Sequence, residues 1–297
     1  MNTKTRMWIA ALRLRTLPLS WAGIVAGTAM AVREGNWRPG VFALSLLTAS
    51  LYQILSNLAN DYGDGVKGTD NHRKGPLRAV QSGIISPDEM KRAIVLTVIL
   101  SVMSTLALLV TAFGRIDTTF IAYFLLGLAA VWAAIKYTVG RTAYGYAGLG
   151  DLFVLIFFGF VAVAGSYYLY TGRFNLYIMY PALAIGLMSV AVLNLNNMRD
   201  RETDLRSGKI TLAVKLGHNN AFAYHRALLS MSFLLLLYLA IRQPAYKTGF
   251  IAPIPALFLW WLSYGLQRKN EGQAYNEMLK RTSLLTLLTA ILLWPLF

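Results

Sequence analysis

The chain has 297 residues, of which 56% are hydrophobic and only 14% are charged. Soluble domains carry about 25% charged residues, so this composition argues against an ordinary soluble enzyme. The mean hydropathy of +0.50 excludes an intrinsically disordered chain. The absence of cysteine excludes disulfide scaffolds, thiolate metal sites and thiol nucleophiles. The net charge of +15 fits either a nucleic-acid-binding surface or the basic loops of a membrane protein, and the positions of the charges decide between them.

Long apolar stretches bounded by charged residues predict membrane-spanning helices. Their predicted ranges are 17–32, 40–58, 93–113, 118–136, 149–170, 176–195, 222–241, 248–266 and 282–297. The stretches are too long and too rich in leucine and alanine for the strands of a membrane barrel. Only the polar segments at about 57–92 and 196–221 are long, so we expect no separate soluble domain. The sequence therefore predicts an all-α, polytopic membrane protein with nine transmembrane helices in a single domain over 1–297.

Lysine and arginine are distributed unevenly between the two sides of this predicted bundle. Only six of the 28 lie on the side reached after the odd-numbered spans: Arg33, Arg38, Arg115, Arg173, Arg242 and Lys247. By the positive-inside rule, the richer side, with the N-terminus and both long polar segments, faces the cytoplasm, and we expect the protein in the cytoplasmic (inner) membrane. Most of the net charge then reflects topology. We expect no nucleic-acid binding, because no basic groove with stacking aromatics emerges.

Two acidic motifs follow the second and sixth predicted spans, and they share a spacing. Asn60 lies four residues before Asp64, and Asn196 lies four residues before Asp200. Four spans separate the two motifs, so both are expected on the cytoplasmic face. Side chains three or four apart share a helix face, so further oxygen-bearing residues can join each stripe. These are Asn57 and Asp61 in the first motif and Asp204 in the second.

Facing carboxylate clusters at a membrane boundary repel each other unless a positive charge lies between them. Polar groups at membrane depth are costly and usually functional. Oxygen ligands without histidine or cysteine suit a hard cation, and Mg²⁺, which shares its coordination with water and phosphate, fits best. Basic residues that could clamp a phosphate group follow both motifs: Lys67, Arg73, Lys74, Arg78, Arg206, Lys209 and Lys215. The pattern predicts a phosphorylated or diphosphorylated substrate bound through Mg²⁺ at the cytoplasmic edge of the bundle.

Each of these residue groups also has a purely structural interpretation. Aspartate and asparagine at helix ends are often caps, and basic loop residues often only set topology. Lys209 and Arg78 lie closest to the motif cores and are favoured as substrate contacts. Asp151 opens the fifth span, where capping is as good an explanation as chemistry. Three tyrosines fall in a loop that faces the same region: Tyr137, Tyr144 and Tyr146.

The paired motifs resemble those of the UbiA superfamily of intramembrane aromatic prenyltransferases. Members of this superfamily are nine-helix bundles around a central cavity, with motifs of the form NxxxDxxxD after helices two and six. They transfer an isoprenoid chain from a polyprenyl diphosphate to an aromatic acceptor, using Mg²⁺. The second motif matches this form as Asn196, Asp200 and Asp204.

The first motif departs from the family form, because five residues instead of three separate Asp64 from Asp70. Two glycines, Gly65 and Gly68, could let the backbone turn Asp70 back toward the site, or Asp61 could substitute for it. This departure resembles the MenA branch, which acts on 1,4-dihydroxy-2-naphthoate. So do the blocks NLANDYGDGVKGTD, YAGLGDLFVLIFFGFVAV and NNMRDRETDLRSGKITLAVKLG, which occur in family order.

The resemblance implies a magnesium-dependent transfer followed by decarboxylation, which gives demethylmenaquinone in menaquinone biosynthesis. Residues implied to hold the metal are Asp64, Asp70, Asp200 and Asp204, with Asp61 as a substitute. Residues implied to bind substrate are Asn60, Lys67, Arg78, Tyr137, Asp151, Asn196 and Lys209, with Arg13 or Arg15 on the acceptor carboxylate. Asp64, Asp200, Asp204 and Lys209 would be catalytic. The prenyl tail would run through the apolar bundle into the lipid bilayer.

Other functions remain open from the sequence alone. The nearest is a different acceptor, such as 4-hydroxybenzoate, homogentisate, chlorophyllide or haem, because metal motifs barely discriminate among acceptors. A secondary transporter is disfavoured, since the acidic clusters lie at helix ends on one face and not at broken helices in mid-bilayer. A membrane scaffold would leave the clustered carboxylates without a purpose.

Overall fold

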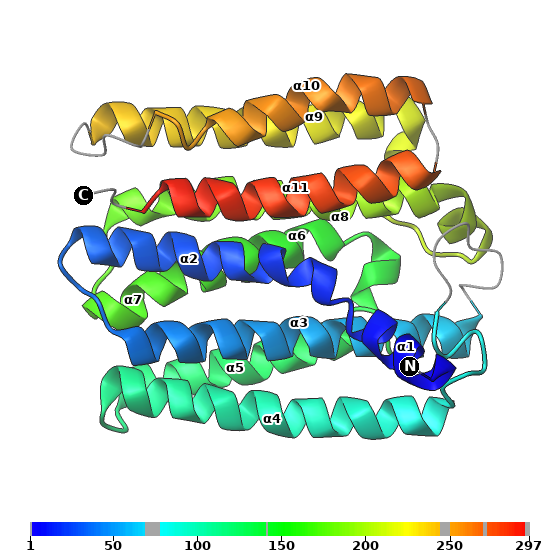
Figure 1. Ribbon diagram of the computed structural model, residues 1–297, viewed down its shortest axis with the longest axis horizontal. Coiled ribbons are helices and arrows are strands. Elements are labelled where there is room, and N and C mark those ends of the chain that lie inside the picture. Colours follow the sequence, from blue (N-terminus) through cyan, green and yellow to red (C-terminus); the bar gives the residue numbers. More distant parts are fainter. Residues whose placement is uncertain (1, 69–77, 141, 244–249, 270–271, 295–297) are drawn as a thin grey trace.

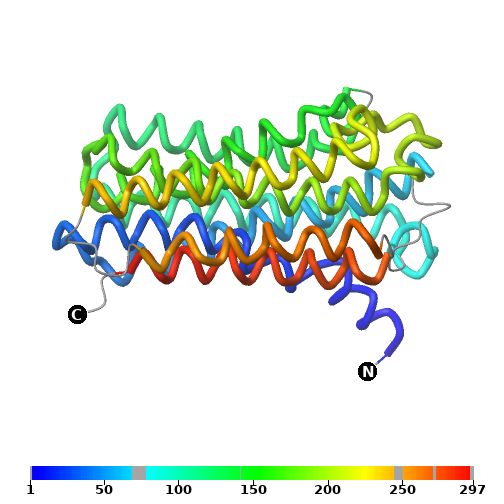
Figure 2. The backbone as a smooth tube through the Cα atoms, turned by 90° about the horizontal axis from the view of Figure 1, so that it is seen from above, coloured from blue at the N-terminus to red at the C-terminus, as the bar shows by residue number. Residues whose placement is uncertain are grey.

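The computed structural model describes residues 2–68, 78–140, 142–243, 250–269 and 272–294. Within these ranges the chain forms helices and no strand, and the long helices lie side by side along one axis (Figures 1 and 2). The main helices are α1 (Thr3–Leu12), α2 (Leu17–Arg33), α3 (Pro39–Lys67), α4 (Pro87–Phe113), α5 (Thr118–Lys136), α6 (Gly150–Val154), α7 (Ser166–Thr171), α8 (Met179–Arg206), α9 (Leu212–Arg242), α10 (Ile254–Lys269) and α11 (Gly272–Leu292).

Short helical turns join or extend these helices. Three are 3₁₀ turns: η1 (Leu14–Thr16), η2 (Tyr144–Ala147) and η4 (Leu176–Ile178). The segment between α6 and α7 is η3 (Leu155–Gly165), an 11-residue π-helix. Such segments are rare and often occur at functional sites.

The structure confirms the predicted all-α membrane fold. Among the described residues, seven helical segments are long and apolar enough to cross a membrane, and they coincide with the first seven predicted spans. The eighth and ninth predicted spans correspond to α10 and α11, which run alongside the others in the same bundle (Figure 1). In the described part of the chain, the apolar faces of neighbouring helices bury three hydrophobic clusters. Many leucine, isoleucine and tryptophan side chains remain exposed and can contact lipid.

The helices that carry the acidic motifs extend beyond their predicted spans. Helix α3 continues nine residues past position 58 to Lys67, and α8 continues to Arg206 instead of ending at 195. Both extensions bury polar side chains, including Asp64 and Asp204, against other parts of the chain. Much of the two stretches predicted as loops is therefore helical, and the helical backbone determines the direction in which each motif side chain points.

The π-helix η3 packs closely against α2 and α8 because glycines remove the side chains between them. A Cβ atom built on Gly27 of α2 would lie 2.2 Å from the backbone oxygen of Val163, and one on Gly159 would lie 2.7 Å from the backbone oxygen of Ala182. These contacts leave no room for even a methyl group. Close packing of this kind fixes η3 as one wall of the interior.

Substitution of Gly27 by alanine is expected to destabilise the bundle. The new methyl group meets backbone atoms of η3, which cannot rotate away, so we expect the free energy of unfolding to fall by about 2 kcal/mol. Thermal unfolding of the detergent-purified protein measures the effect. Gly265→Ala in α10 is the matched control, because nothing lies within 4 Å of its Cβ position and alanine favours the helix. Equal melting temperatures for the two variants would contradict this account of the packing.

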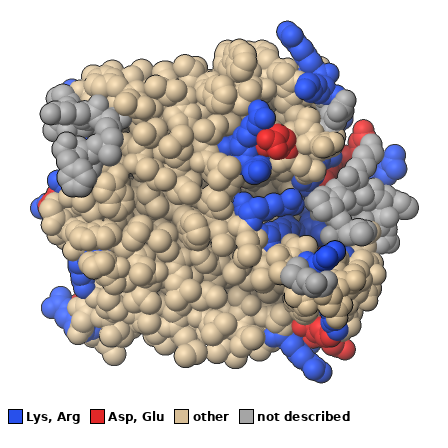
Figure 3. Space-filling model, viewed as in Figure 1, with Lys and Arg blue, Asp and Glu red and all other residues tan. Residues whose placement is uncertain are grey.

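The two ends of the bundle differ in charge. Figure 3 shows lysine and arginine gathered toward the end where α3 and α8 terminate, and lining a hollow there. At the other end, the Glu34 carboxylate joins α2 to the segment around α7. It accepts hydrogen bonds from Tyr167 Oη at 2.7 Å, Arg173 Nη2 at 2.8 Å and Asn175 Nδ2 at 3.2 Å. These bonds tie together loops that are far apart in the sequence.

Candidate functional site

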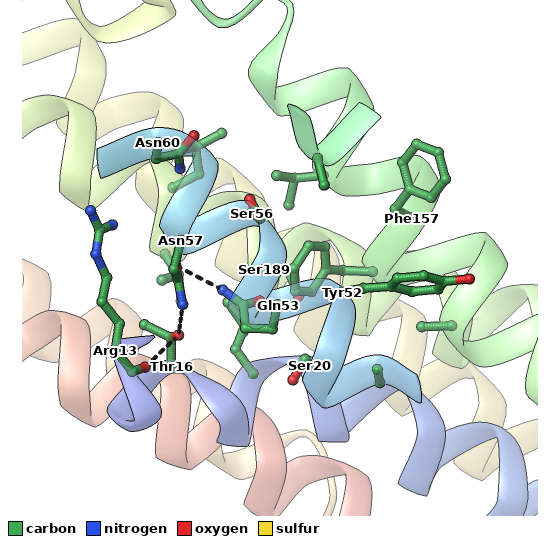
Figure 4. A pocket seen from close by; sticks show the side chains of 18 of the residues that line it. Arg13, Thr16, Ser20, Tyr52, Gln53, Ser56, Asn57, Asn60, Phe157 and Ser189 are labelled. Carbon is green, nitrogen blue, oxygen red and sulfur yellow. Dashed lines mark hydrogen bonds between the residues drawn. The ribbon is translucent and has the colours of Figure 1, made fainter. Parts of the chain in front are cut away.

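A cavity of about 1010 Å³ extends from the motif ends of α3 and α8 into the bundle. This volume lies at the upper limit for small-molecule sites. One wall comes from η3 and its flanks and is apolar, with Phe157 and Val161 among its residues. The opposite wall comes from α3, where Gln53, Asn57 and Asn60 follow one another along the helix (Figure 4). The cavity can therefore hold a ligand that has both a long apolar part and a polar end.

Asp64 and Lys209 line the polar end of this cavity, and Asp204 lies beside Lys209. All three residues are buried. Helix α8 ends at Arg206, and Gly208 with φ of +74° turns the chain back, so that the backbone N–H of Lys209 donates to the Asp204 carbonyl at 2.8 Å. The Lys209 Nζ atom then lies 3.7 Å from Asp204 Oδ1 and 4.0 Å from Asp64 Oδ2. One ammonium group thus lies between carboxylates from the two motifs.

Lys209 keeps its charge despite its burial. Burial lowers the pKa of Lys209, but the carboxylates of Asp64 and Asp204 outweigh it and raise the pKa above its ordinary value of 10.5. The stabilisation from this charge is therefore fully present at neutral pH, and it is lost only as the pH rises through the raised pKa. The site offers a permanent positive charge and two carboxylates in contact with it.

Tyr146 of η2 joins this cluster from the chain segment before α6. Its hydroxyl donates to Asp64 Oδ1 at 2.8 Å. The Lys67 Nζ atom lies 3.9 Å from the centre of the Tyr146 ring and donates to the Thr138 carbonyl at 2.9 Å. Lys67 therefore stacks on the tyrosine ring, near the Asp64 carboxylate. Tyr146 thus orients Asp64 through its hydroxyl, and its ring holds the Lys67 ammonium through a cation–π interaction.

Asp200 is paired with a residue that the motif spacing did not single out. Arg199 donates from Nε to Asp200 Oδ1 at 2.8 Å and from Nη2 to Asp200 Oδ2 at 2.7 Å. The same Nη2 donates to Asn196 Oδ1 at 2.7 Å. The sequence signal for Arg199 is its place between Asn196 and Asp200, but arginines near membrane boundaries usually only set topology.

The polar side chains of the first motif contact different parts of the protein. Both oxygens of Asp61 accept backbone N–H groups, from Ala79 at 3.1 Å and from Val80 at 3.0 Å. Asn57 Nδ2 donates to Thr16 Oγ1 at 3.2 Å, as Figure 4 shows. Asp61 therefore anchors the segment before α4, and Asn57 anchors the junction of α1 and α2, while Asp64 alone of these three joins the charged cluster.

The other predicted site residues divide into three groups. Tyr137, Arg78 and Arg15 line the cavity, with Asn60, whose Oδ1 accepts from Thr138 Oγ1 at 3.1 Å. Burial raises the pKa of Tyr137, and nearby carboxylates raise it further, so this phenol stays protonated at neutral pH. Asp151 accepts from Tyr224 Oη of α9 at 2.9 Å and is not among the cavity-lining residues. Asp70 lies outside the described residues.

The donor set fits a hard divalent cation that also binds phosphate. Asp64 and Asp204 both contact the Nζ atom of Lys209, so their oxygens already converge on one positive charge. Across the described part of the chain, no group of three or more histidine, cysteine, aspartate or glutamate residues is placed to hold a metal alone. Mg²⁺ suits such a site, since it typically takes one or two carboxylates and completes its coordination with water and substrate phosphates.

Comparisons with known proteins agree with this geometry. The UbiA prenyltransferase family profile matches residues 20–285. The chain is 44% identical over 291 residues to the 1,4-dihydroxy-2-naphthoate octaprenyltransferase of Escherichia coli, covering 98% of this chain and 94% of that protein. It is 40% identical to the Haemophilus influenzae protein of the same name, covering 98% and 95%.

The fold is also similar to a solved structure. A UbiA homologue from Archaeoglobus fulgidus, bound to GPP and Mg²⁺, superimposes with a TM-score of 0.63 at 15% identity. The match covers 94% of this chain and 98% of that one. At this identity the likeness concerns the fold.

Proposed function

Because this chain belongs to the UbiA prenyltransferase family, we propose that it transfers a polyprenyl chain from a polyprenyl diphosphate to 1,4-dihydroxy-2-naphthoate. The observation that carries this proposal is that Asp64 and Lys209 line the polar end of an apolar cavity, where Lys209 lies between Asp64 and Asp204. Relatives named for this reaction, at 40% identity or more over nearly the whole chain, specify the acceptor. The product belongs to menaquinone biosynthesis.

The polar end of the cavity would bind the diphosphate. Lys209 and Arg78 are buried cations that line the cavity, and they would pair with phosphate oxygens. Asp64, Asp200 and Asp204 would hold Mg²⁺ together with diphosphate oxygens, since these three carboxylates are not placed to bind a metal by themselves, and Asp70 would be a further ligand. The metal would neutralise the diphosphate and so assist its departure. We assign Asp61 to positioning, since two backbone N–H groups already occupy its carboxylate.

The remaining cavity residues suit an allylic cation and an aromatic acceptor. As the C–O bond of the prenyl diphosphate breaks, the electron pair leaves with the diphosphate, and the apolar wall of η3 excludes water from the cation. The ring carbon that bears the carboxylate would then form the new C–C bond, and as its bond to the carboxylate breaks, carbon dioxide leaves and the electron pair of that bond restores the aromatic ring. Arg15, on the cavity rim, would hold the acceptor carboxylate beforehand, with Tyr137 and Asn60 lining the path between the two substrates.

We further propose the position of the protein in the cell. The chain is an integral, multi-pass membrane protein. The bias of lysine and arginine toward the motif end supports an orientation in which that end, with the N-terminus, faces the cytoplasmic side of the inner membrane. Water-soluble diphosphate would then be released into the cytoplasm, while the prenylated product stays with the bilayer.

A product assay tests the proposed function. Purified protein in detergent is supplied with Mg²⁺, a medium-chain polyprenyl diphosphate and either 1,4-dihydroxy-2-naphthoate or 4-hydroxybenzoate, and products are identified by mass. We expect a prenylated naphthoquinol that has lost its carboxylate. A prenylated 4-hydroxybenzoate that keeps its carboxylate would support the alternative acceptor and the same metal chemistry. No product from either acceptor would contradict the proposal.

A further inference from the structure

Arg199 is a buried arginine whose guanidinium is bonded on three sides. Its side chain is 4% exposed. Beyond its bonds to Asp200 and Asn196, its Nη1 donates to Asn276 Oδ1 of α11 at 2.8 Å. Asn276 lines the cavity with its α11 neighbours Gln273 and Lys280. Arg199 thus links the second acidic motif to another wall of the cavity.

The pairing of Arg199 with Asp200 is unusual for adjacent residues. Consecutive side chains on a helix do not face each other. The Arg199 side chain is nevertheless long enough for its guanidinium to reach Asn196 and Asp200 on the helix face that these two residues share. A guanidinium fork binds a carboxylate through two parallel hydrogen bonds, which makes a strong and directional pair when buried. Arg199 therefore acts as a dedicated counter-ion of Asp200.

The other two motif carboxylates, Asp64 and Asp204, share one ammonium group at longer range. Lys209 Nζ lies 3.7 Å from Asp204 and 4.0 Å from Asp64, beyond ordinary hydrogen-bond distance. Asp200 instead receives two short bonds from one group. A divalent cation can thus take the place of the Lys209 ammonium beside Asp64 and Asp204 while Tyr146 still donates to Asp64, whereas it must compete with a fixed guanidinium for Asp200.

We propose that Arg199 is a positioning residue that competes with the metal for Asp200 and so weakens metal binding. This inference rests on the metal site proposed above. When Asp200 turns from Arg199 to the metal, the guanidinium loses its main partner, and its bond to Asn276 is no longer fixed. Occupation of the metal site is thereby coupled to α11 and to the cavity wall that α11 provides.

The test compares Mn²⁺ binding by the detergent-purified full chain and by Arg199→Gln, measured by electron paramagnetic resonance with inorganic pyrophosphate present and absent. We expect Arg199→Gln to bind Mn²⁺ at least about tenfold more tightly without pyrophosphate, equivalent to about 1.4 kcal/mol, because one competing positive charge is removed. A merely structural role predicts the opposite sign, since a disordered motif would bind the metal more weakly. Weaker or unchanged Mn²⁺ affinity would overturn the inference.

Two further variants keep the test decisive. Asn276→Ala removes the link to α11 but keeps the Arg199–Asp200 pair, so its Mn²⁺ affinity should stay within about twofold of the original. Arg199→Lys keeps the charge but loses the fork, so it should bind Mn²⁺ more tightly than the original chain, and this comparison stands even if the glutamine variant does not fold. Tighter binding by Asn276→Ala than by Arg199→Lys would overturn the inference. If the unmodified chain binds no Mn²⁺ in either condition, the proposed metal site fails together with it.

Discussion

Asp64→Asn is expected to lower kcat for prenyl transfer by at least about a thousandfold while the protein still folds. Asparagine has the same size as aspartate and keeps an oxygen for the Tyr146 hydroxyl, which lies 2.8 Å away. What it loses is the negative charge that faces Lys209 and would hold Mg²⁺. Without that charge the diphosphate would not be neutralised as the C–O bond breaks. Product formation at saturating prenyl diphosphate and Mg²⁺ measures the loss.

Asp61→Asn is the matched control for this prediction. Asp61 lies three residues earlier on the same helix, but its oxygens accept the backbone N–H groups of Ala79 and Val80. We expect this variant to lose about 1–2 kcal/mol of stability and to keep an unchanged dependence of the rate on Mg²⁺ concentration. Full activity in Asp64→Asn, or a changed Mg²⁺ dependence in Asp61→Asn alone, would show that the two carboxylates have been assigned the wrong roles.

Lys209→Met is expected both to slow transfer by about a hundredfold or more and to destabilise the protein without Mg²⁺. Methionine fills the same space without a charge, so the buried carboxylates of Asp64 and Asp204 would face each other uncompensated, at a cost of about 3–5 kcal/mol. Added Mg²⁺ should restore much of the melting temperature, because the metal would take the place of the ammonium. It should not restore the rate, since the diphosphate would lose a cation.

Lys67→Met separates the effect of charge from the effect of position. Lys67 is also a lysine beside Tyr146, but it is exposed and its Nζ donates to a backbone carbonyl. Its loss should lower the melting temperature only slightly and the rate by less than about tenfold. Equal effects of the two methionine variants on stability and rate would exclude a special role for the ammonium between the two motifs.

The membrane fold could be predicted because hydropathy alone dictates which segments leave water. The spans around 118–136 and 17–32 agree with α5 and α2 to within a residue. The ends of α3 and α8 could not be located this way, because their last turns are polar. These turns are buried by other parts of the protein and not by lipid, so a hydropathy pattern does not include them. Asp64 and Asp204 belong to those turns, and contacts with distant segments bury them.

The candidate site could be predicted as a set of residues but not as a set of contacts. Asp61 and Asp64 share a helical stripe in the sequence, and only the path of residues 78–80 and the position of Tyr146 distinguish an anchoring carboxylate from one that faces Lys209. Arg199 could not be told from a topology-determining arginine, because its burial depends on α11, about 77 residues later. The π-helix was equally hidden, since Leu155–Gly165 is apolar at every position and has no helical period to read.

The Glu34 cluster, at the end of the bundle away from the acidic motifs, determines how that surface responds to an acidic environment. Burial alone would raise the pKa of Glu34, but the hydrogen bonds from Tyr167, Arg173 and Asn175 outweigh it and lower the pKa below its ordinary value of 4.5. The stabilising contribution is therefore complete above pH 4.5 and disappears only as the pH falls through the lowered pKa. If this end faces outward, the segments that Glu34 joins stay joined in surroundings acid enough to protonate an ordinary glutamate.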